Sequence, residues 1–322
     1  MSASRAGRLK AALGQIDELI QSGRLGEAEA LARRAAAEHP LSAPAHFALG
    51  FIAQSMGRFE AAEPALARAV TLDARNADYL TNFGLCLLSM GRVPEAAARY
   101  QKAREVDPRG FDTAWRYGSF LSRIGHMEQA LAAYESALAK APEGARPAIR
   151  LDVVECLLSL GRVDEAEQRM RRDLDSTPFR GRYLCLLSGT RKHDADSELF
   201  ALIAREIARP QLPLIERSDL MVRQGVLLHN SGRFDAAFET ITQGKKLLKA
   251  PSAVPAFTRE VDERIAAFTP ERIAQYQKLY GRSDYSPIFV VGLPRSGTTL
   301  AAQIISAHSQ AGNAGELETM TY

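Results

Sequence analysis

Near the C-terminus, the segment PIFVVGLPRSGTTL carries the residue types of an anion-binding loop. Gly292 and Gly297 allow backbone angles that a β-carbon would block, so successive N–H groups of the loop can point at one anion. The N-terminus of a following helix adds about half an elementary positive charge. Thr298 and Thr299 can donate hydroxyl hydrogen bonds, and the Arg295 guanidinium suits phosphate or sulfate oxygens. We therefore expect this loop to bind a phosphate- or sulfate-bearing ligand.

A strand before this loop and a helix after it must position these groups. PIFVV is a continuous β-branched and aromatic run, which predicts a buried strand. The apolar residues Leu300, Ile304 and Ile305 predict a helix that begins at Thr298 or Thr299. Strand, glycine loop and helix together have the geometry of a phosphate-binding loop. GLPRSGTT has Thr298 where the Walker A pattern requires lysine, which argues against a nucleotide kinase or NTPase.

The same loop resembles the 5′-phosphosulfate-binding loop of sulfotransferases, whose core is P-[KR]-[ST]-G-T-[TS]. The stretch PRSGTT matches that core at every position. The resemblance implies 3′-phosphoadenosine 5′-phosphosulfate as the sulfuryl donor, and it implies no metal. It assigns donor binding to Arg295, Ser296, Gly297, Thr298 and Thr299. The structural alternative is a turn in which Arg295 pairs with a helix carboxylate and the threonines cap a helix.

The residues after the loop, AHSQAGNAGELETM, resemble most closely the tyrosylprotein and related bacterial sulfotransferases. Counted without gaps from Arg295, Glu316 falls where the tyrosylprotein enzymes place their catalytic base. The resemblance thus implies two catalytic residues, Glu316 as base and Arg295 as stabiliser of the leaving group. A solvated loop glutamate is the alternative for Glu316. His308 lies too far along the predicted helix to reach the anion, and we interpret it as structural.

A repeat with a period of about 34 residues occupies most of the chain. Its Gly-Arg or Gly-His turns recur at steps of 34, 34, 34, 36 and 71 residues, at Gly23, Gly57, Gly91, Gly125, Gly161 and Gly232. Each unit reads as two helices, and one such hairpin cannot bury both of its faces alone. The pattern resembles the tetratricopeptide repeat, which implies an α-solenoid. We expect the solenoid over residues 1–250, with a degenerate repeat or insertion near residues 179–217.

The resemblance also implies a concave groove lined by the first helix of each pair. Asn82, Trp115, Arg116 and Arg123 are predicted to project into it. Binding of a protein or peptide is one interpretation of this groove, and the sulfuryl acceptor is one candidate for that partner. A solvated inner face or an intramolecular contact is the other.

Composition narrows the class of protein. The formal net charge of +3 is spread over 41 basic and 38 acidic residues, so no block of charge indicates a nucleic-acid partner. The three cysteines are far apart in apolar runs, which favours reduced core thiols. No signal peptide and no apolar run long enough to span a membrane is recognisable. These features predict a cytoplasmic protein.

The predicted organisation ends in an incomplete domain. Residues 251–286 read as a helical connector, and residues 287–322 read as the first β-loop-α unit of a P-loop-like α/β sulfotransferase domain. The family's 3′-phosphate-binding segment and later motifs have no counterpart in these 322 residues. We expect a sulfotransferase in the parent protein and little or no activity from this chain alone. The alternative is a tetratricopeptide adaptor without catalysis. The sequence identifies neither the acceptor nor the oligomeric state.

Overall fold

The computed structural model describes residues 5–248, 254–267, 269–280, 288, 290, 291, 297–309 and 311. The chain forms two compact units, residues 1–245 and residues 246–322. Among the described residues the secondary structure is helical, as expected for the solenoid.

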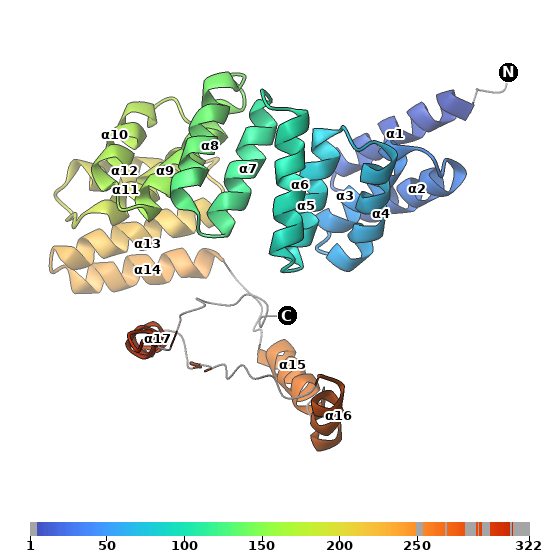
Figure 1. Ribbon diagram of the computed structural model, residues 1–322. Coiled ribbons are helices and arrows are strands. Elements are labelled where there is room, and N and C mark those ends of the chain that lie inside the picture. Colours follow the sequence, from blue (N-terminus) through green and yellow to red (C-terminus); the bar gives the residue numbers. More distant parts are fainter. Residues whose placement is uncertain are drawn as a thin grey trace. The chain divides into compact units, whose positions relative to one another are not determined.

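The first unit is a stack of antiparallel helix pairs in which each pair packs on the next (Figure 1). Its helices are α1 (Arg5–Gln21), α2 (Leu25–Glu38), α3 (Ala43–Ser55), α4 (Phe59–Leu72), α5 (Ala77–Ser89), α6 (Val93–Val106), α7 (Phe111–Arg123), α8 (Met127–Lys140), α9 (Arg146–Ser159), α10 (Val163–Asp173), α11 (Arg180–Thr190), α12 (Glu198–Ile207), α13 (Leu214–Asn230) and α14 (Phe234–Leu247).

Glycine turns close the hairpins of the stack at the predicted places. The six repeat glycines adopt left-handed backbone angles, with φ between 73° and 82°, at Gly23, Gly57, Gly91, Gly125, Gly161 and Gly232. A β-carbon is strained in this region of backbone space, which explains why the repeat places glycine there.

Close helix crossings in several of the pairs depend on a second set of glycines. A β-carbon on Gly84 would lie 2.9 Å from the ring of Tyr100, and one on Gly118 would lie 2.7 Å from the ring of Tyr134. Ala96 is fully buried one turn before Tyr100. The missing β-carbon of Gly84 or Gly118 therefore makes room for a tyrosine ring of the second helix in the pair.

Arginines of the Gly-Arg turns tie neighbouring repeats together at the surface. Arg58 pairs with Glu29 of the preceding repeat at 2.5 Å, and Arg92 pairs with Glu63 in the equivalent place, also at 2.5 Å. Exposed ion pairs of this kind each contribute at most about 1 kcal/mol. The buried apolar core carries most of the stability of the stack.

The segment that lacks the repeat signature still forms a helix pair. Tyr183 and Leu184 of α11 are fully buried, as is Ile203 of α12. The loop between the two helices is anchored on the next pair, since Ser231 Oγ accepts a hydrogen bond from the Ala195 N–H at 2.7 Å. This stretch is a repeat whose turn chemistry has changed, and it continues the stack.

The second unit contains α15 (Val254–Ala267), α16 (Pro270–Tyr280) and α17 (Thr298–Ser306). The first two occupy the predicted connector, and α17 is the predicted loop helix. The predicted strand at PIFVV is wrong for its described residues, because Ile288, Val290 and Val291 have no strand structure. A strand exists only through hydrogen bonds to a neighbouring strand, and the described part of the chain supplies none.

We find no helix in the described ranges that is both long and apolar enough to cross a bilayer.

Candidate functional site

The start of α17 has the backbone geometry that the anion-loop hypothesis requires. Gly297 immediately precedes the helix with φ 90° and ψ 15°, a left-handed conformation that favours glycine. Its carbonyl accepts the Ala301 N–H at 2.9 Å, which is the first hydrogen bond of the helix. No side chain caps this end of α17 among the described residues. The N–H groups of its first turn therefore lack a side-chain acceptor there and suit an anion.

The predicted donor-binding residues divide into two groups. Thr298 is half-buried and Thr299 is exposed in the first turn of α17, next to Gly297. Arg295, Ser296 and the proposed base Glu316 lie outside the described residues. The turn and the helix start are thus observed, whereas the roles of the three remaining side chains stay predictions.

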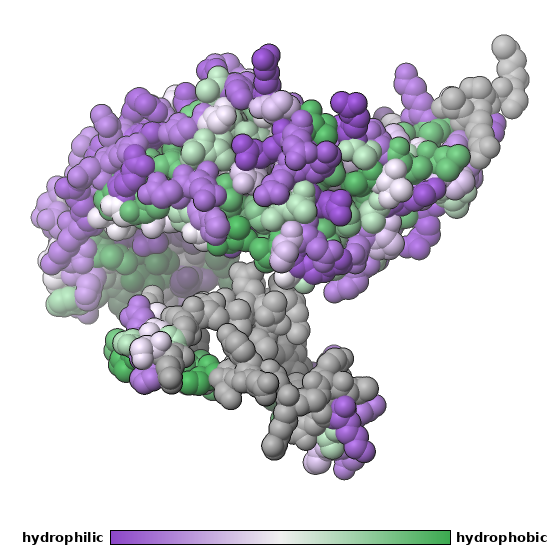
Figure 2. All heavy atoms as spheres, in the orientation of Figure 1, coloured by the Kyte–Doolittle hydropathy of each residue, from purple (hydrophilic) through white to green (hydrophobic). Residues whose placement is uncertain are grey.

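Apolar side chains around the loop are open to solvent. Ile288 is 68% exposed and Val291 is 87% exposed, before the loop; Leu300 and Ile304 on α17 are 61% and 66% exposed. Figure 2 shows the same apolar character on α17. A segment with so much uncovered apolar surface has not buried a core of its own among the described residues.

The first helix of each pair contributes to one side of the stack, which we call the odd-helix face, formed by α1, α3, α5, α7, α9, α11 and α13. Neighbouring odd-numbered helices contact one another, for example α3 with α5 and α5 with α7. The four predicted groove residues belong to α5 and α7 of this face.

These four residues differ in how available they are. Asn82 is only 3% exposed, and its Nδ2 donates to the Asp78 carbonyl at 2.8 Å, so it offers little surface to a partner. Arg116 is half-buried and its Nε pairs with Asp112 at 2.5 Å. Arg123 is exposed, and no hydrogen bond or ion pair to it occurs within the described part of the chain.

The charges of Arg116 and Arg123 both act on Tyr100 of α6. Burial raises the pKa of the Tyr100 hydroxyl to about 12, against the opposing effect of these two charges.

Trp115 has a partner that the sequence did not indicate. Its Nε1–H donates to Asp152 Oδ2 at 2.5 Å, which connects α7 to α9. Burial raises the pKa of the Asp152 carboxyl, the hydrogen bond from Trp115 opposes that shift, and the charge of Glu155 adds to it. Asp152 could have been found from the repeat spacing. The step of 36 residues from Gly125 to Gly161 aligns Asp152 with Arg116, which was a predicted groove residue. Asp152 therefore occupies the repeat position of a predicted groove residue, and the prediction missed it.

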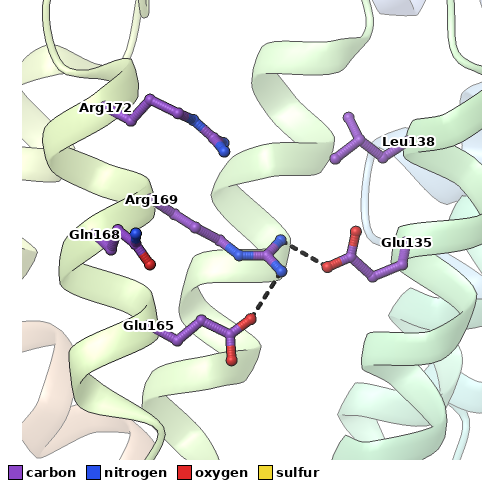
Figure 3. A pocket seen from close by; sticks show the side chains of 6 residues that line it. All are labelled: Glu135, Leu138, Glu165, Gln168, Arg169 and Arg172. Carbon is purple, nitrogen blue, oxygen red and sulfur yellow. Dashed lines mark hydrogen bonds and ion pairs between the residues drawn. The ribbon is translucent and has the colours of Figure 1, made fainter.

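A hollow of about 660 Å³ lies elsewhere on the stack, between α8 and α10 (Figure 3). Arg169 reaches across it and pairs with Glu135 at 2.6 Å and with Glu165 at 2.8 Å. Because two carboxylates already satisfy this guanidinium, we interpret the hollow as a structural seam between repeats.

Comparison with protein families gives two kinds of match. Models of the tetratricopeptide repeat match residues 19–82, 82–145 and 123–188, which together cover more than half of the chain. A model of the sulfotransferase family matches residues 287–321. The second match contains the whole candidate loop, α17 and Glu316.

A curated relative from Aquifex aeolicus (strain VF5), described as an uncharacterized protein, is 29% identical over 174 residues. That alignment covers 52% of this chain and 22% of the relative. The chain thus spans less than a quarter of the length of this relative.

Solved structures share the fold of the stack. A thermophilic tetratricopeptide-repeat protein from Thermus thermophilus is 24% identical, with a TM-score of 0.50 over 56% of this chain and 98% of that one. A tetratricopeptide-repeat protein from Parabacteroides merdae is 15% identical, with a TM-score of 0.55 over 76% of this chain and 95% of that one. At these identities the likeness shows the fold alone.

Proposed function

The chain belongs to the tetratricopeptide-repeat family, and we propose that its helical stack binds a protein partner. We also propose that the chain carries the donor-binding loop of a sulfotransferase, which begins near residue 292. The observation that carries the proposal is the coincidence of three features at one place. The sulfotransferase-family match covers residues 287–321, Gly297 has a left-handed turn, and the helix that starts at Thr298 has no side-chain cap among the described residues.

The chemistry of the loop favours a phosphosulfate over a triphosphate. Arg295 can pair with sulfate or phosphate oxygens in a planar geometry, and the first-turn N–H groups of α17 can receive the same anion. Thr298 stands where a triphosphate-binding loop needs lysine. Donor binding at residues 297–299 is the part of the proposal that the described backbone supports most closely.

The proposed reaction is in-line sulfuryl transfer from 3′-phosphoadenosine 5′-phosphosulfate. The acceptor hydroxyl oxygen forms a bond to sulfur while the bond from sulfur to the bridging phosphate oxygen breaks. Glu316 takes the hydroxyl proton, and 3′-phosphoadenosine 5′-phosphate leaves with the bonding electron pair. Arg295 and the loop N–H groups stabilise the charge that develops on the bridging oxygen.

The stack supplies partner binding in this proposal. Arg123 on α7 offers a charge without a counterion among the described residues, and the half-buried side chain of Trp115 offers aromatic surface on the same helix. A cytoplasmic place of action belongs to the same proposal, and the support for it is that Cys86, Cys156 and Cys185 are all free and buried.

The test measures binding of 3′-phosphoadenosine 5′-phosphosulfate to the 322-residue chain. Saturation-transfer difference NMR is the method, because it detects weak binding. We expect a signal from the donor that Arg295→Ala abolishes. The matched control is Arg259→Ala, which removes an exposed arginine from α15 and should leave the signal unchanged. Equal signals from the wild type and Arg295→Ala would remove the loop assignment and favour an adaptor without catalysis.

Turnover gives a second, independent outcome. We expect no measurable sulfuryl transfer by the 322 residues, because the sequence has no counterpart of the family's later motifs. Substantial transfer by this chain would contradict that expectation while leaving the donor loop in place.

A further inference from the structure

Asp152 differs electrostatically from the other acidic residues around it. Asp112 pairs with Arg116, and Glu155 pairs with Arg182 at 2.7 Å. Asp152 is half-buried on α9 and pairs with no cation in the part of the chain that the structure describes. Its recorded hydrogen bond comes from the neutral indole of Trp115.

The groups nearest to Asp152 leave its charge uncompensated. Trp115 is neutral, and so is the Tyr134 hydroxyl, whose pKa is raised to about 12 by burial and next by the charge of Asp152. Glu155 has the same sign as Asp152 and opposes its ionisation. A half-buried carboxylate with neutral or like-charged neighbours is costly to keep ionised. A cation from outside the chain would remove that cost.

Trp115 adds a second element of cation recognition. The face of an indole attracts ammonium and guanidinium groups more strongly than other aromatic rings do. The Trp115 side chain is half-buried, and its hydrogen bond to Asp152 fixes the indole edge beside the carboxylate. That bond uses Oδ2, so Oδ1 stays available as an acceptor for a charged donor.

We propose that Asp152 and Trp115 form a subsite on the odd-helix face for one lysine or arginine side chain of an extended protein segment. The inference rests on the proposed function of the stack as a partner-binding surface. Complementarity of charge selects the basic residue, because the bound cation supplies the counterion that Asp152 lacks among the described residues. The alkyl stem of lysine or arginine can lie along the half-buried indole while its charged end reaches the carboxylate.

The subsite carries its own probe, since Trp115 is the only tryptophan in the chain. Capped arginine amide and capped lysine amide are titrated into the full chain at constant ionic strength, and tryptophan fluorescence is recorded. Capped citrulline amide is the neutral isostere of arginine. We expect a saturable change with arginine or lysine and none with citrulline.

The decisive variant is Asp152→Asn, which keeps an oxygen for the Trp115 hydrogen bond and removes the charge. We expect its apparent affinity for the cationic amide to fall by about tenfold or more. The matched control is Asp219→Asn, which removes an exposed carboxylate from α13 of the same face and should leave the titration unchanged. Circular dichroism confirms that both variants are folded.

Three results would overturn the subsite: no saturable response to either cation, an equal response to citrulline, or an equal response of Asp152→Asn and the wild type. Each is separable from failure of the proposed function. Donor binding at residues 295–299 is read from the NMR signal of the phosphosulfate, which Asp152→Asn should not change. A partner segment that binds the stack equally well after Asp152→Asn would keep the partner-binding proposal and remove the subsite.

Discussion

The helical stack and the segment around α17 contain comparable apolar residues but place them differently. Leu66 of α4 is fully buried beside Gly50 of α3, whereas Leu300 of α17 is 61% exposed. The first belongs to a continuous core that runs through successive repeats. The second belongs to a segment whose described residues have no such core. A repeat pair finds its packing partners one period away in the sequence, and an isolated loop helix does not.

The two regions also differ in how much of their structure supports itself through packing. In the stack, the same turn glycine recurs and each hairpin covers its neighbour. Around α17, one left-handed glycine and one helix start are all that the described residues provide. The same backbone device thus serves packing in one region and, in our proposal, ligand binding in the other.

The largest expected effect comes from the same substitution made in both regions. Leu66→Ala should lower the free energy of unfolding of the stack by about 2 to 5 kcal/mol, because it leaves a cavity in a fully buried site. Leu300→Ala should change it by less than about 0.5 kcal/mol. Urea unfolding followed by circular dichroism measures both. Equal losses would show that α17 is part of the folded core.

A second effect, of about 1 to 3 kcal/mol, is expected for Gly118→Ala, because the added β-carbon would lie 2.7 Å from the Tyr134 ring. Gly144→Ala is the control, since no atom lies within 4 Å of the β-carbon that it adds. Thermal melts of the two variants should separate clearly. If they coincide with the wild type, the glycine contact does not set the helix crossing.

The third prediction uses left-handed glycines in both regions. Gly161→Ala and Gly297→Ala each place a β-carbon at positive φ, at 73° and 90°, with a local cost of about 1 kcal/mol. We expect Gly161→Ala to lower the unfolding free energy of the stack and Gly297→Ala to leave it unchanged. Gly297→Ala should weaken the NMR signal of the bound donor instead. An unchanged donor signal from Gly297→Ala would show that the turn has no role in donor binding.

The fourth prediction concerns pH. Since burial raises the pKa of Asp152, the ionised carboxylate destabilises the fold, and stability is lost as pH rises through that raised pKa. Asp152→Asn should therefore be more stable than the wild type at pH 7. The difference should disappear below the ordinary carboxyl pKa of 3.8, where both side chains are neutral. A constant difference across this range, measured by thermal melts, would mean that Asp152 is not destabilised by its charge.

The smallest effect is expected at the surface ion pairs of the stack. Arg92→Ala removes contacts with Glu63 and Glu95 and should cost about 0.2 to 1 kcal/mol at low salt. Added salt should reduce this cost, because it screens exposed charges. Urea unfolding at two ionic strengths measures the change, and a large, salt-independent loss would assign Arg92 a role in packing.

The repeat was predictable because its signals are local and recur. Each turn glycine, such as Gly57 or Gly91, indicates a helical hairpin by itself, and the regular spacing of these glycines indicates the repeat. The helix start at Thr298 was predictable for the same reason, because glycine precedes an apolar period of helical spacing. Local signals therefore accounted for helix pairs, turns and the start of α17.

Contacts between repeats were harder to predict, because they depend on residues far apart in sequence. Trp115 and Asp152 are 37 positions apart, and their hydrogen bond follows from the stacking of α7 and α9. Asn82 was expected in the groove, but it bonds to the carbonyl of Asp78 in its own helix. The strand at PIFVV fails among its described residues because strand structure requires a partner strand, and no local pattern can provide one.

If the loop before α17 selects a phosphosulfate, other anions should differ in how well they displace the donor from it. The NMR signal of bound 3′-phosphoadenosine 5′-phosphosulfate is recorded on the 322-residue chain while ATP with Mg²⁺ or 3′-phosphoadenosine 5′-phosphate is added. We predict that 3′-phosphoadenosine 5′-phosphate displaces the donor and that ATP with Mg²⁺ does not, because Thr298 replaces the lysine of a triphosphate loop. If ATP with Mg²⁺ displaced the donor and 3′-phosphoadenosine 5′-phosphate did not, the assignment of the loop to a phosphosulfate would be wrong.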